Sequence, residues 1–186
     1  MKQPAFVRQT HFIGVLLPED ITLTLEDCRR YMQESYGCKS GYGTPIHVTL
    51  VPPFYLPQEY ATRDIVHSLE SSVLSEGLGF TARIDNFSAF GDRTVFAKVL
   101  AGSQWTALRD ATLNAVLAVC PGCTKKDKRP FQPHATVANR DIPPGVTSDA
   151  LVVLNELNLA EDFPVDNITI FERNGSVWQV GMTLSL

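Results

Sequence analysis

The chain carries the same three-residue pattern twice, and this repetition constrains its fold more than any other feature. His47-Val48-Thr49 and His134-Ala135-Thr136 stand 87 positions apart in 186 residues, close to half the chain length. Side chains alternate between the two faces of a β-strand, so residues i and i+2 share a face. Each segment is therefore predicted to be a strand that buries one face and presents an imidazole and a hydroxyl on the other.

Further strands and helices are predicted around these two segments. Short apolar stretches bounded by Gly or Pro indicate strands, and apolar residues three or four positions apart indicate helices. The predicted strands are residues 11–17, 46–51, 79–90, 93–100, 134–138, 165–172 and 177–184. The predicted helices are residues 20–36, 58–75, 103–119 and 147–157, with Asp20, Ser103 and either Thr147 or Ser148 as N-caps. Pro52-Pro53 is expected to end the second strand.

The order of these elements repeats. A strand, a helix and a strand with His-x-Thr occupy the first quarter of the chain, and a helix and a second such strand occupy the third. This rhythm predicts an α+β fold in which two similar antiparallel-sheet lobes form one intertwined domain over residues 1–186. A hydrophobic content of 44% is enough for a sizeable core.

The charge of the chain restricts its partners. The formal net charge is −4, whereas proteins that grip long nucleic acids are usually basic. We therefore expect a small nucleotide or a single RNA end as the ligand, and no long DNA. No window approaches the roughly 18 apolar residues of a membrane helix, and the first 20 residues contain no signal-peptide core. We expect a cytoplasmic monomer with no membrane partner.

The four cysteines raise the question of a redox or metal site. Cys28, Cys38, Cys120 and Cys123 are expected to be reduced in a cytosolic chain. The last two have CxxC spacing, but they follow a predicted helix and enclose Pro-Gly, which favours a turn that ends the helix. A zinc site would need a second pair with matched spacing. A metalloprotein with His and Cys ligands is therefore the least favoured hypothesis.

The paired motif suits displacement at phosphorus. A neutral imidazole can take a proton from an attacking water, and an imidazolium can give one to the leaving oxygen, because the ordinary pKa of His is about 6.5. Threonine hydroxyls can donate hydrogen bonds to the phosphate oxygens, and no metal is required. The alternative is that Thr serves as a strand former and His as a structural residue. His11 and His67 lack the motif and are interpreted as structural or surface residues.

With its flanking residues, the pair resembles the 2H phosphoesterase superfamily, in particular its 2′-5′ RNA ligase-like and cyclic phosphodiesterase members. The resembling stretches are residues 47–54 and 131–137, together with 12–18 and 163–178. The resemblance implies two antiparallel sheets that line a central cleft, with helices outside. It also implies a phosphodiesterase without a cofactor that acts on 2′,3′-cyclic phosphates, related cyclic nucleotides or RNA ends. The implied catalytic set is His47, Thr49, His134 and Thr136.

One position departs from the family pattern. Many members carry an arginine shortly after the second motif, whereas this chain has Asn139 there and Arg140 one residue later. On a strand, a shift by one residue turns a side chain to the other face. A non-catalytic nucleotide or RNA-end binding module therefore stays as an alternative, and so does 2′-5′ RNA ligase activity.

Four further residues are predicted to bind the substrate. Tyr42 and Phe54 flank the first motif and are candidates to stack on a base, with a place in the core as the alternative for Phe54. Lys126 and Arg129 belong to a basic loop, residues 125–129, that directly precedes the second motif. This loop is predicted either to attract a phosphate or to be a solvated surface segment.

Overall fold

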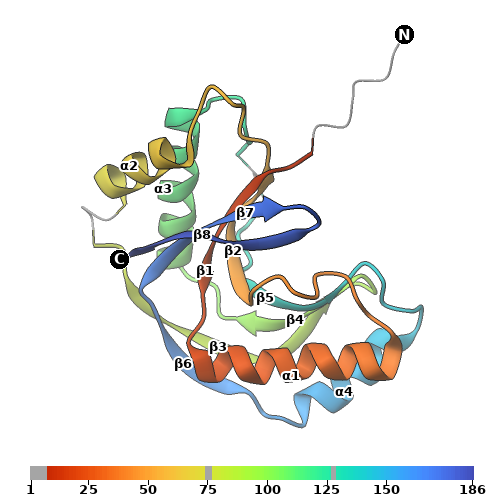
Figure 1. Ribbon diagram of the computed structural model, residues 1–186. Coiled ribbons are helices and arrows are strands. Elements are labelled where there is room, and N and C mark those ends of the chain that lie inside the picture. The colour runs from red at the N-terminus through yellow and green to blue at the C-terminus, as the bar shows by residue number, and fades with distance from the viewer. Residues whose placement is uncertain (1–7, 74–76, 127–128) are drawn as a thin grey trace.

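The computed structural model describes residues 8–73, 77–126 and 129–186, and Figure 1 shows how they are arranged. The strands in these ranges are β1 (His11–Leu16), β2 (His47–Phe54), β3 (Phe80–Phe90), β4 (Thr94–Val99), β5 (His134–Asn139), β6 (Ala160–Val165), β7 (Asn167–Asn174) and β8 (Val177–Ser185). The helices are α1 (Glu19–Tyr36), α2 (Thr62–Ser72), α3 (Ser103–Val119) and α4 (Val146–Asn155). The predicted duplication is confirmed in this order, because the pattern β-α-β-α-β occurs from β1 to β3 and again from β4 to β6.

The strands form a single antiparallel sheet in the order β6-β3-β4-β5-β2-β1-β7-β8. The prediction of an α+β fold with antiparallel strands is confirmed, but the expected two separate sheets are joined into one. The joint is narrow, since Val48 and Ala135 are the one residue pair assigned between β2 and β5 within the described chain. Each half of the sheet has four strands, and the two strands with His-x-Thr meet at the centre.

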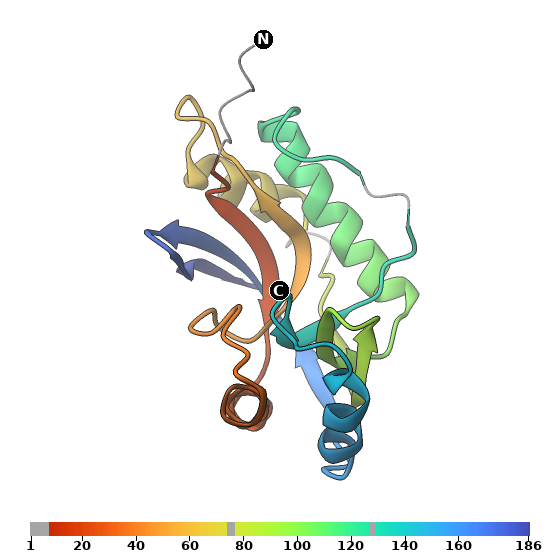
Figure 2. The ribbon, with the colours of Figure 1, turned by 90° about the vertical axis from the view of Figure 1, so that its right-hand side faces the viewer.

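The helices are exchanged between the two halves. α1, which connects β1 to β2, packs against β5, and α3, which connects β4 to β5, packs against β2. α2 lies beside α3, and α4 packs on β3 near α1. Figures 1 and 2 show the resulting arrangement, with α2 and α3 together at one end of the molecule and α1 and α4 at the other.

The two motif strands alternate as predicted. Ile46, Val48 and Leu50 are buried, whereas His47 and Thr49 are only partly buried. In β5 the alternation is the same, with Ala135 and Val137 buried and the histidine and threonine partly exposed. The apolar face joins one continuous core that includes Ile13 of β1, Leu25 of α1 and Trp105 of α3. The polar face stays available for chemistry.

Two strand predictions were wrong, namely the end of β2 at its two prolines and the omission of β6. β2 continues through Pro52-Pro53 to Phe54. The register between β1 and β2 shifts between His11↔Phe54 and Ile13↔Val51, so the two prolines lie at an irregularity of the ladder, and on the other side β5 pairs with β2 only at Val48. β6 was not predicted at all. It is an edge strand with the sequence Ala-Glu-Asp-Phe-Pro-Val and a largely exposed face, so its apolar signal is weak.

The helix boundaries differ from the prediction at their N-termini. The N-cap residues of α1, α3 and α4 are Pro18, Gly102 and Gly145, and none of them makes a side-chain cap. The predicted caps therefore lie inside the first turn of each helix. α2 begins at Thr62 rather than at residue 58, and the end predicted for it falls on residues 74–76, outside the described residues.

The cysteines follow the prediction only in part. Cys28 and Cys38 are free and buried. Cys120 and Cys123 enclose the predicted turn after α3, with the Cys123 amide donating to the Cys120 carbonyl at 3.2 Å. They are joined by a disulfide, however, so the expectation of four reduced thiols was wrong. Three residues of separation in a turn bring the two Cα atoms to 5.5 Å, within the range that a disulfide spans. No helix in the described ranges is long and apolar enough to cross a membrane.

Candidate functional site

The four motif side chains surround the point where the two halves of the sheet meet. Val48 and Ala135 are antiparallel partners, so the residues on either side of each of them point to the opposite face of the sheet. Antiparallel order places the first histidine beside the second threonine, and the first threonine beside the second histidine. The two imidazoles are therefore diagonal neighbours across the joint, with one hydroxyl next to each.

Both imidazoles are held in the same tautomer. Nδ1 of His47 lies 2.7 Å from the carbonyl oxygen of Pro45, and Nδ1 of His134 lies 2.8 Å from that of Gln132. A carbonyl oxygen only accepts hydrogen bonds, so Nδ1 is the protonated nitrogen in each ring. Nε2 of each histidine is left to take up or give a proton. In both motifs the hydrogen bond joins the histidine to the carbonyl two residues earlier, as expected for two duplicated segments.

Each imidazole also packs against two phenylalanine rings from equivalent strands. His47 contacts Phe12 of β1 and Phe171 of β7, with ring centroids 4.6 and 5.1 Å apart. His134 contacts Phe96 of β4 and Phe90 of β3, with centroids 5.1 and 5.0 Å apart. The aromatic rings fix the orientation of each imidazole and shield one side of it from water.

Burial makes both histidines weak bases. It lowers the pKa of His47 to about 4, against an upward effect of the Pro45 hydrogen bond, and the charges of Arg29 and His134 lower it further. Burial also lowers the pKa of His134, with the Gln132 hydrogen bond opposing it. Both rings are thus neutral at pH 7 in the free protein. A bound phosphate anion favours the imidazolium form and shifts the pKa values upward again.

A cavity of about 960 Å³ opens on one side of the joint. Thr49 and His134 line it together with α3 and the segment before β5. Its full lining is Thr49, Leu50, Pro52, Phe90, Ala101, Arg109, Leu113, Lys125, Arg129, Pro130, Phe131, Gln132 and His134. Three of these residues are cationic and none is acidic, so the described lining favours an anionic ligand.

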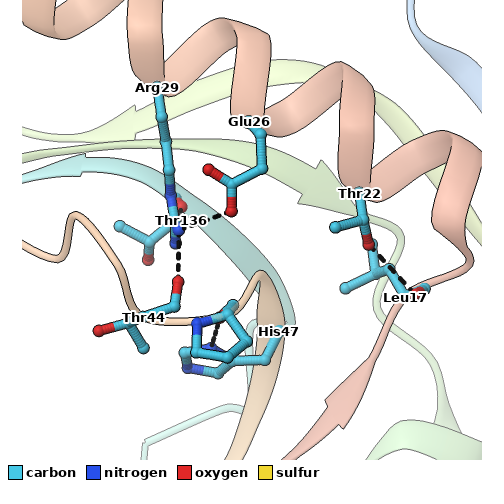
Figure 3. A network of polar contacts seen from close by, with 8 residues as sticks. Leu17, Thr22, Glu26, Arg29, Thr44, His47 and Thr136 are labelled. Atoms are coloured by element: carbon cyan, nitrogen blue, oxygen red, sulfur yellow. Dashed lines mark hydrogen bonds and ion pairs between the residues drawn. The ribbon is translucent and has the colours of Figure 1, made fainter. Parts of the chain in front are cut away.

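On the other side of the joint lies a buried arginine. The side chain of Arg29, from α1, is 6% exposed, and its guanidinium donates to the carbonyl oxygens of Thr44 and Thr136. It also pairs with Glu26 one turn earlier on the helix, at 3.2 Å. Figure 3 shows these contacts together with His47. Burial lowers the pKa of Arg29, but a guanidinium keeps its charge in proteins.

The family model described as the 2′-5′ RNA ligase superfamily matches residues 17–176 of the chain. The chain belongs to this superfamily, whose members are 2H phosphoesterases. No curated protein sequence matches it significantly.

Several solved structures share the fold over nearly the whole chain. TT0787 of Thermus thermophilus has a TM-score of 0.68 at 20% identity, with 95% of this chain and 97% of that one covered. Escherichia coli LigT in complex with 3′-AMP has a TM-score of 0.61 at 19% identity, with 96% and 98% covered. The PDE domain of MHV ns2 has a TM-score of 0.52 at 13% identity, with 96% and 99% covered.

The predicted substrate-binding residues of this superfamily member fall in different places. Phe54 is 3% exposed and packs in the core with its ring 5.8 Å from that of His11, so the core alternative holds and stacking on a base does not. Tyr42 is 52% exposed in the loop before β2 and lies outside the cavity lining. Arg129 lines the cavity, whereas Lys126 is exposed and its neighbour Lys125 takes the lining position. Residues 127 and 128 of the loop lie outside the described residues.

Asn139 and Arg140, at the position where the sequence departs from the expected arginine, have different surroundings. The side-chain oxygen of Asn139 accepts a hydrogen bond from the Thr94 hydroxyl at 3.0 Å, so this amide closes the end of β5. Arg140 lies beyond the strand, exposed and with a positive φ of 71°.

The other two histidines have structural surroundings. His11 contacts Thr10 and Thr62, with Glu172 at 3.7 Å, and His67 is an exposed partner of Glu70. Among the described residues no group of three or more His, Cys, Asp or Glu is arranged to hold a metal.

Two arginines near the site were missed by sequence reasoning. Arg29 interrupts the apolar stripe of α1 between Leu25 and Met32, and a charge at such a position is a usable signal. Arg109 of α3 lines the cavity, with its guanidinium 5.2 Å from the centre of the Phe131 ring and paired with Asp110. No local pattern distinguishes it from any surface arginine, because the cavity is completed by residues of β2, such as Thr49 and Pro52, that are distant in the sequence.

Proposed function

We propose that this member of the 2′-5′ RNA ligase superfamily is a metal-independent phosphodiesterase that hydrolyses 2′,3′-cyclic phosphates of nucleotides or RNA ends. The observation that carries the proposal is the pair of identical imidazole tautomers, each with Nε2 available and a threonine hydroxyl beside it. Two proton-transfer groups and two hydrogen-bond donors around one point suit in-line displacement at phosphorus.

In the proposed reaction, water attacks phosphorus and gives its proton to Nε2 of His47. The bond between phosphorus and one ribose oxygen breaks, and Nε2 of His134 donates a proton to that oxygen. A bond from phosphorus to the water oxygen replaces the broken one, and the two histidines have exchanged protonation states. We assign the base role to His47 because burial and the nearby charge of Arg29 keep it neutral, whereas among the described residues burial alone lowers the pKa of His134.

The threonines and the cavity supply the remaining functions. Thr49 and Thr136 donate hydrogen bonds to the non-bridging phosphate oxygens, where negative charge develops. Arg109, Lys125 and Arg129 attract further phosphate groups of the substrate. A volume of about 960 Å³ is at the upper end of the range for small-molecule sites, so it accommodates a nucleotide. LigT structures with 3′-AMP, ATP and NADP+ support nucleotides as the ligand class.

The test is turnover of a panel of 2′,3′-cyclic nucleotides and short RNAs with cyclic ends, each with and without EDTA. We expect hydrolysis to a single phosphomonoester, unchanged by EDTA. Loss of activity on chelation would contradict the metal-independent mechanism, and absence of turnover over the whole panel would contradict the proposed activity.

Two alternatives have specific support. Asn139 stands where an arginine is expected, and this favours a non-catalytic module that binds nucleotides or RNA ends. Binding of cyclic nucleotides without turnover would support this alternative. Because the same acid–base pair can run the reaction in reverse, 2′-5′ RNA ligase activity is expected to accompany hydrolysis if RNA ends with a 2′,3′-cyclic phosphate and a 5′-hydroxyl are supplied together. Incubation of such RNA pairs, followed by nuclease mapping of the linkage, separates these outcomes.

A further inference from the structure

The joint between the two halves of the sheet is too narrow to fix the site by itself. β2 pairs with β5 at Val48 and Ala135 alone, whereas β1 pairs with β2, and β4 with β5, over five residue pairs each. The four motif side chains sit on either side of this one pair. A small rotation about it would change the separation of the imidazoles, so another contact must hold the strands.

Arg29 makes such a contact. It comes from α1, a helix that connects the strands of one half and packs on β5 of the other. Its Nη2 donates to the carbonyl oxygen of Thr136 at 3.3 Å, inside the second motif, and its Nη1 donates to that of Thr44, three residues before the first motif (Figure 3). The fork therefore holds one carbonyl from each of the two segments that lead into the site.

The side-chain chemistry of arginine is required for this role. Its guanidinium is planar and rigid, and it presents several N–H groups in fixed directions, which the single ammonium of lysine cannot reproduce. Burial of a charge is costly unless its donors are satisfied. Here two carbonyls and the carboxylate of Glu26 accept hydrogen bonds from the guanidinium, and the positive charge is kept close to His47.

We propose that Arg29 is a positioning residue of the two-histidine site, which fixes the two motif strands relative to each other and places a buried positive charge behind the bound phosphate. This inference rests on the proposed phosphodiesterase function. Arg29 acts through backbone carbonyls, so it is distinct from the motif residues themselves.

The experiment compares Arg29→Met and Arg29→Lys with Arg30→Met as the matched control. Arg30 is the next residue of the same helix, 56% exposed and paired only with Asp27 among its described contacts. With a 2′,3′-cyclic nucleotide as substrate, we expect kcat to fall about 100-fold in Arg29→Met, because a misplacement near 1 Å costs this much. KM should change less than kcat. Arg29→Lys should lose most of the same kcat, and Arg30→Met should match the wild type.

A second readout separates positioning from simple stability. Titration of the His47 ring by NMR should show a higher pKa in Arg29→Met, because a nearby positive charge is removed, and a pKa close to the wild type in Arg29→Lys. The groups that act on His47 are Arg29 from α1, His134 from β5 and the Pro45 carbonyl, and only the first changes. Amide exchange in residues 46–50 and 134–137 should become faster in both variants.

The outcomes are decisive. Wild-type kcat in a folded Arg29→Met would overturn the proposal, and so would an unchanged His47 titration with unchanged exchange. If Arg29→Met does not fold, the kcat of Arg29→Lys tests the proposal instead. If neither variant folds, Arg29 serves stability alone and the proposal is overturned. If the wild type hydrolyses none of the cyclic phosphates, the proposed function fails, while the titration and exchange results still test the position of Arg29.

Discussion

The two His-x-Thr strands have the same local chemistry in different surroundings. Each histidine gives Nδ1–H to a carbonyl two residues earlier, and each ring lies against two phenylalanines from equivalent strands. Behind His47, however, lies the buried charge of Arg29, whereas His134 faces an open cavity with cations along its wall. Duplication thus provides two equal groups in different electrostatic surroundings, and the proposed assignment of His47 as base and His134 as acid rests on this difference.

The strongest test of this comparison is removal of each histidine. Both His47→Ala and His134→Ala should lower kcat by about 10²–10⁴-fold, the usual contribution of a proton-transfer group. His67→Ala is the control, since that side chain is 75% exposed on α2 and is absent from the cavity lining. Cyclic-nucleotide hydrolysis measures the effect, and full activity in either motif variant would break the equivalence.

The threonines should show a smaller and more equal effect. Thr49→Val and Thr136→Val keep the volume and the strand preference but remove the hydroxyl that is proposed to donate to phosphate oxygens. We expect a fall in kcat of about 10²-fold for each, as for the loss of one oxyanion donor. A large effect in one variant and none in the other, in the same steady-state assay, would mean that only one half binds the phosphate.

The pH dependence of stability should separate the two histidines. The pKa of His47 falls from 6.5 to about 4 on folding, so the unfolded state binds more protons between these values, and stability decreases as pH falls from 6.5 to 4. A shift of this size corresponds to about 3 kcal/mol. Urea unfolding at pH 7 and pH 4 measures it. His47→Asn, which keeps a donor for the Pro45 carbonyl, should remove more of the slope than His134→Asn.

A substitution at Gly14 should disturb the first half of the site only. Gly14 pairs with Thr49, and a Cβ there would lie 2.6 Å from the Val48 carbonyl oxygen and 3.3 Å from Cδ2 of His47. Because backbone must shift, Gly14→Ala should lower the free energy of unfolding by about 1–3 kcal/mol and reduce kcat. The control is Gly102→Ala, where a Cβ meets nothing within 4 Å. Thermal unfolding and steady-state kinetics of both variants measure these changes, and equal effects of the two substitutions would contradict the prediction.

The smallest effect is expected in the cavity beside the second half. Arg109→Met should raise KM for a substrate with a second phosphate by about 10-fold and leave kcat nearly unchanged, because the contact is the same in the ground and transition states. The control is Arg63→Met, because Arg63 is an exposed arginine outside the cavity lining and its loss should leave KM unchanged. KM values for cyclic nucleotides with and without a 5′-phosphate measure the difference, and equal changes for both substrates would remove Arg109 from phosphate binding.

Sequence reasoning succeeded where the structure depends on local patterns. The alternation in residues 46–50 and 134–137 specified which side chains are buried, because a strand has a fixed period of two. The gap between the strands predicted at 165–172 and 177–184 is confirmed as the turn between β7 and β8, where Gly175 adopts a positive φ of 61° that is accessible to glycine. The catalytic candidates followed from these strands.

Sequence reasoning failed where the structure depends on contacts between segments that are distant in the sequence. The single contact between β2 and β5, the extension of β2 through its prolines and the existence of β6 all depend on which strand lies next to which. Arg29 was missed for the same reason, because its acceptors Thr44 and Thr136 are 15 and 107 positions away. Its presence within an apolar helix face was visible, but its partners were not.

The exchange of helices between the two halves has a consequence for how the chain can be divided. If the chain were cut at the hairpin between β3 and β4, the first piece would contain α1 but not the strand β5 that α1 covers, and the second would contain α3 but not β2. Each piece would expose an apolar helix face and an uncovered sheet. We therefore expect neither piece to fold alone, the two to refold only when mixed, and the intact protein to unfold in a single transition.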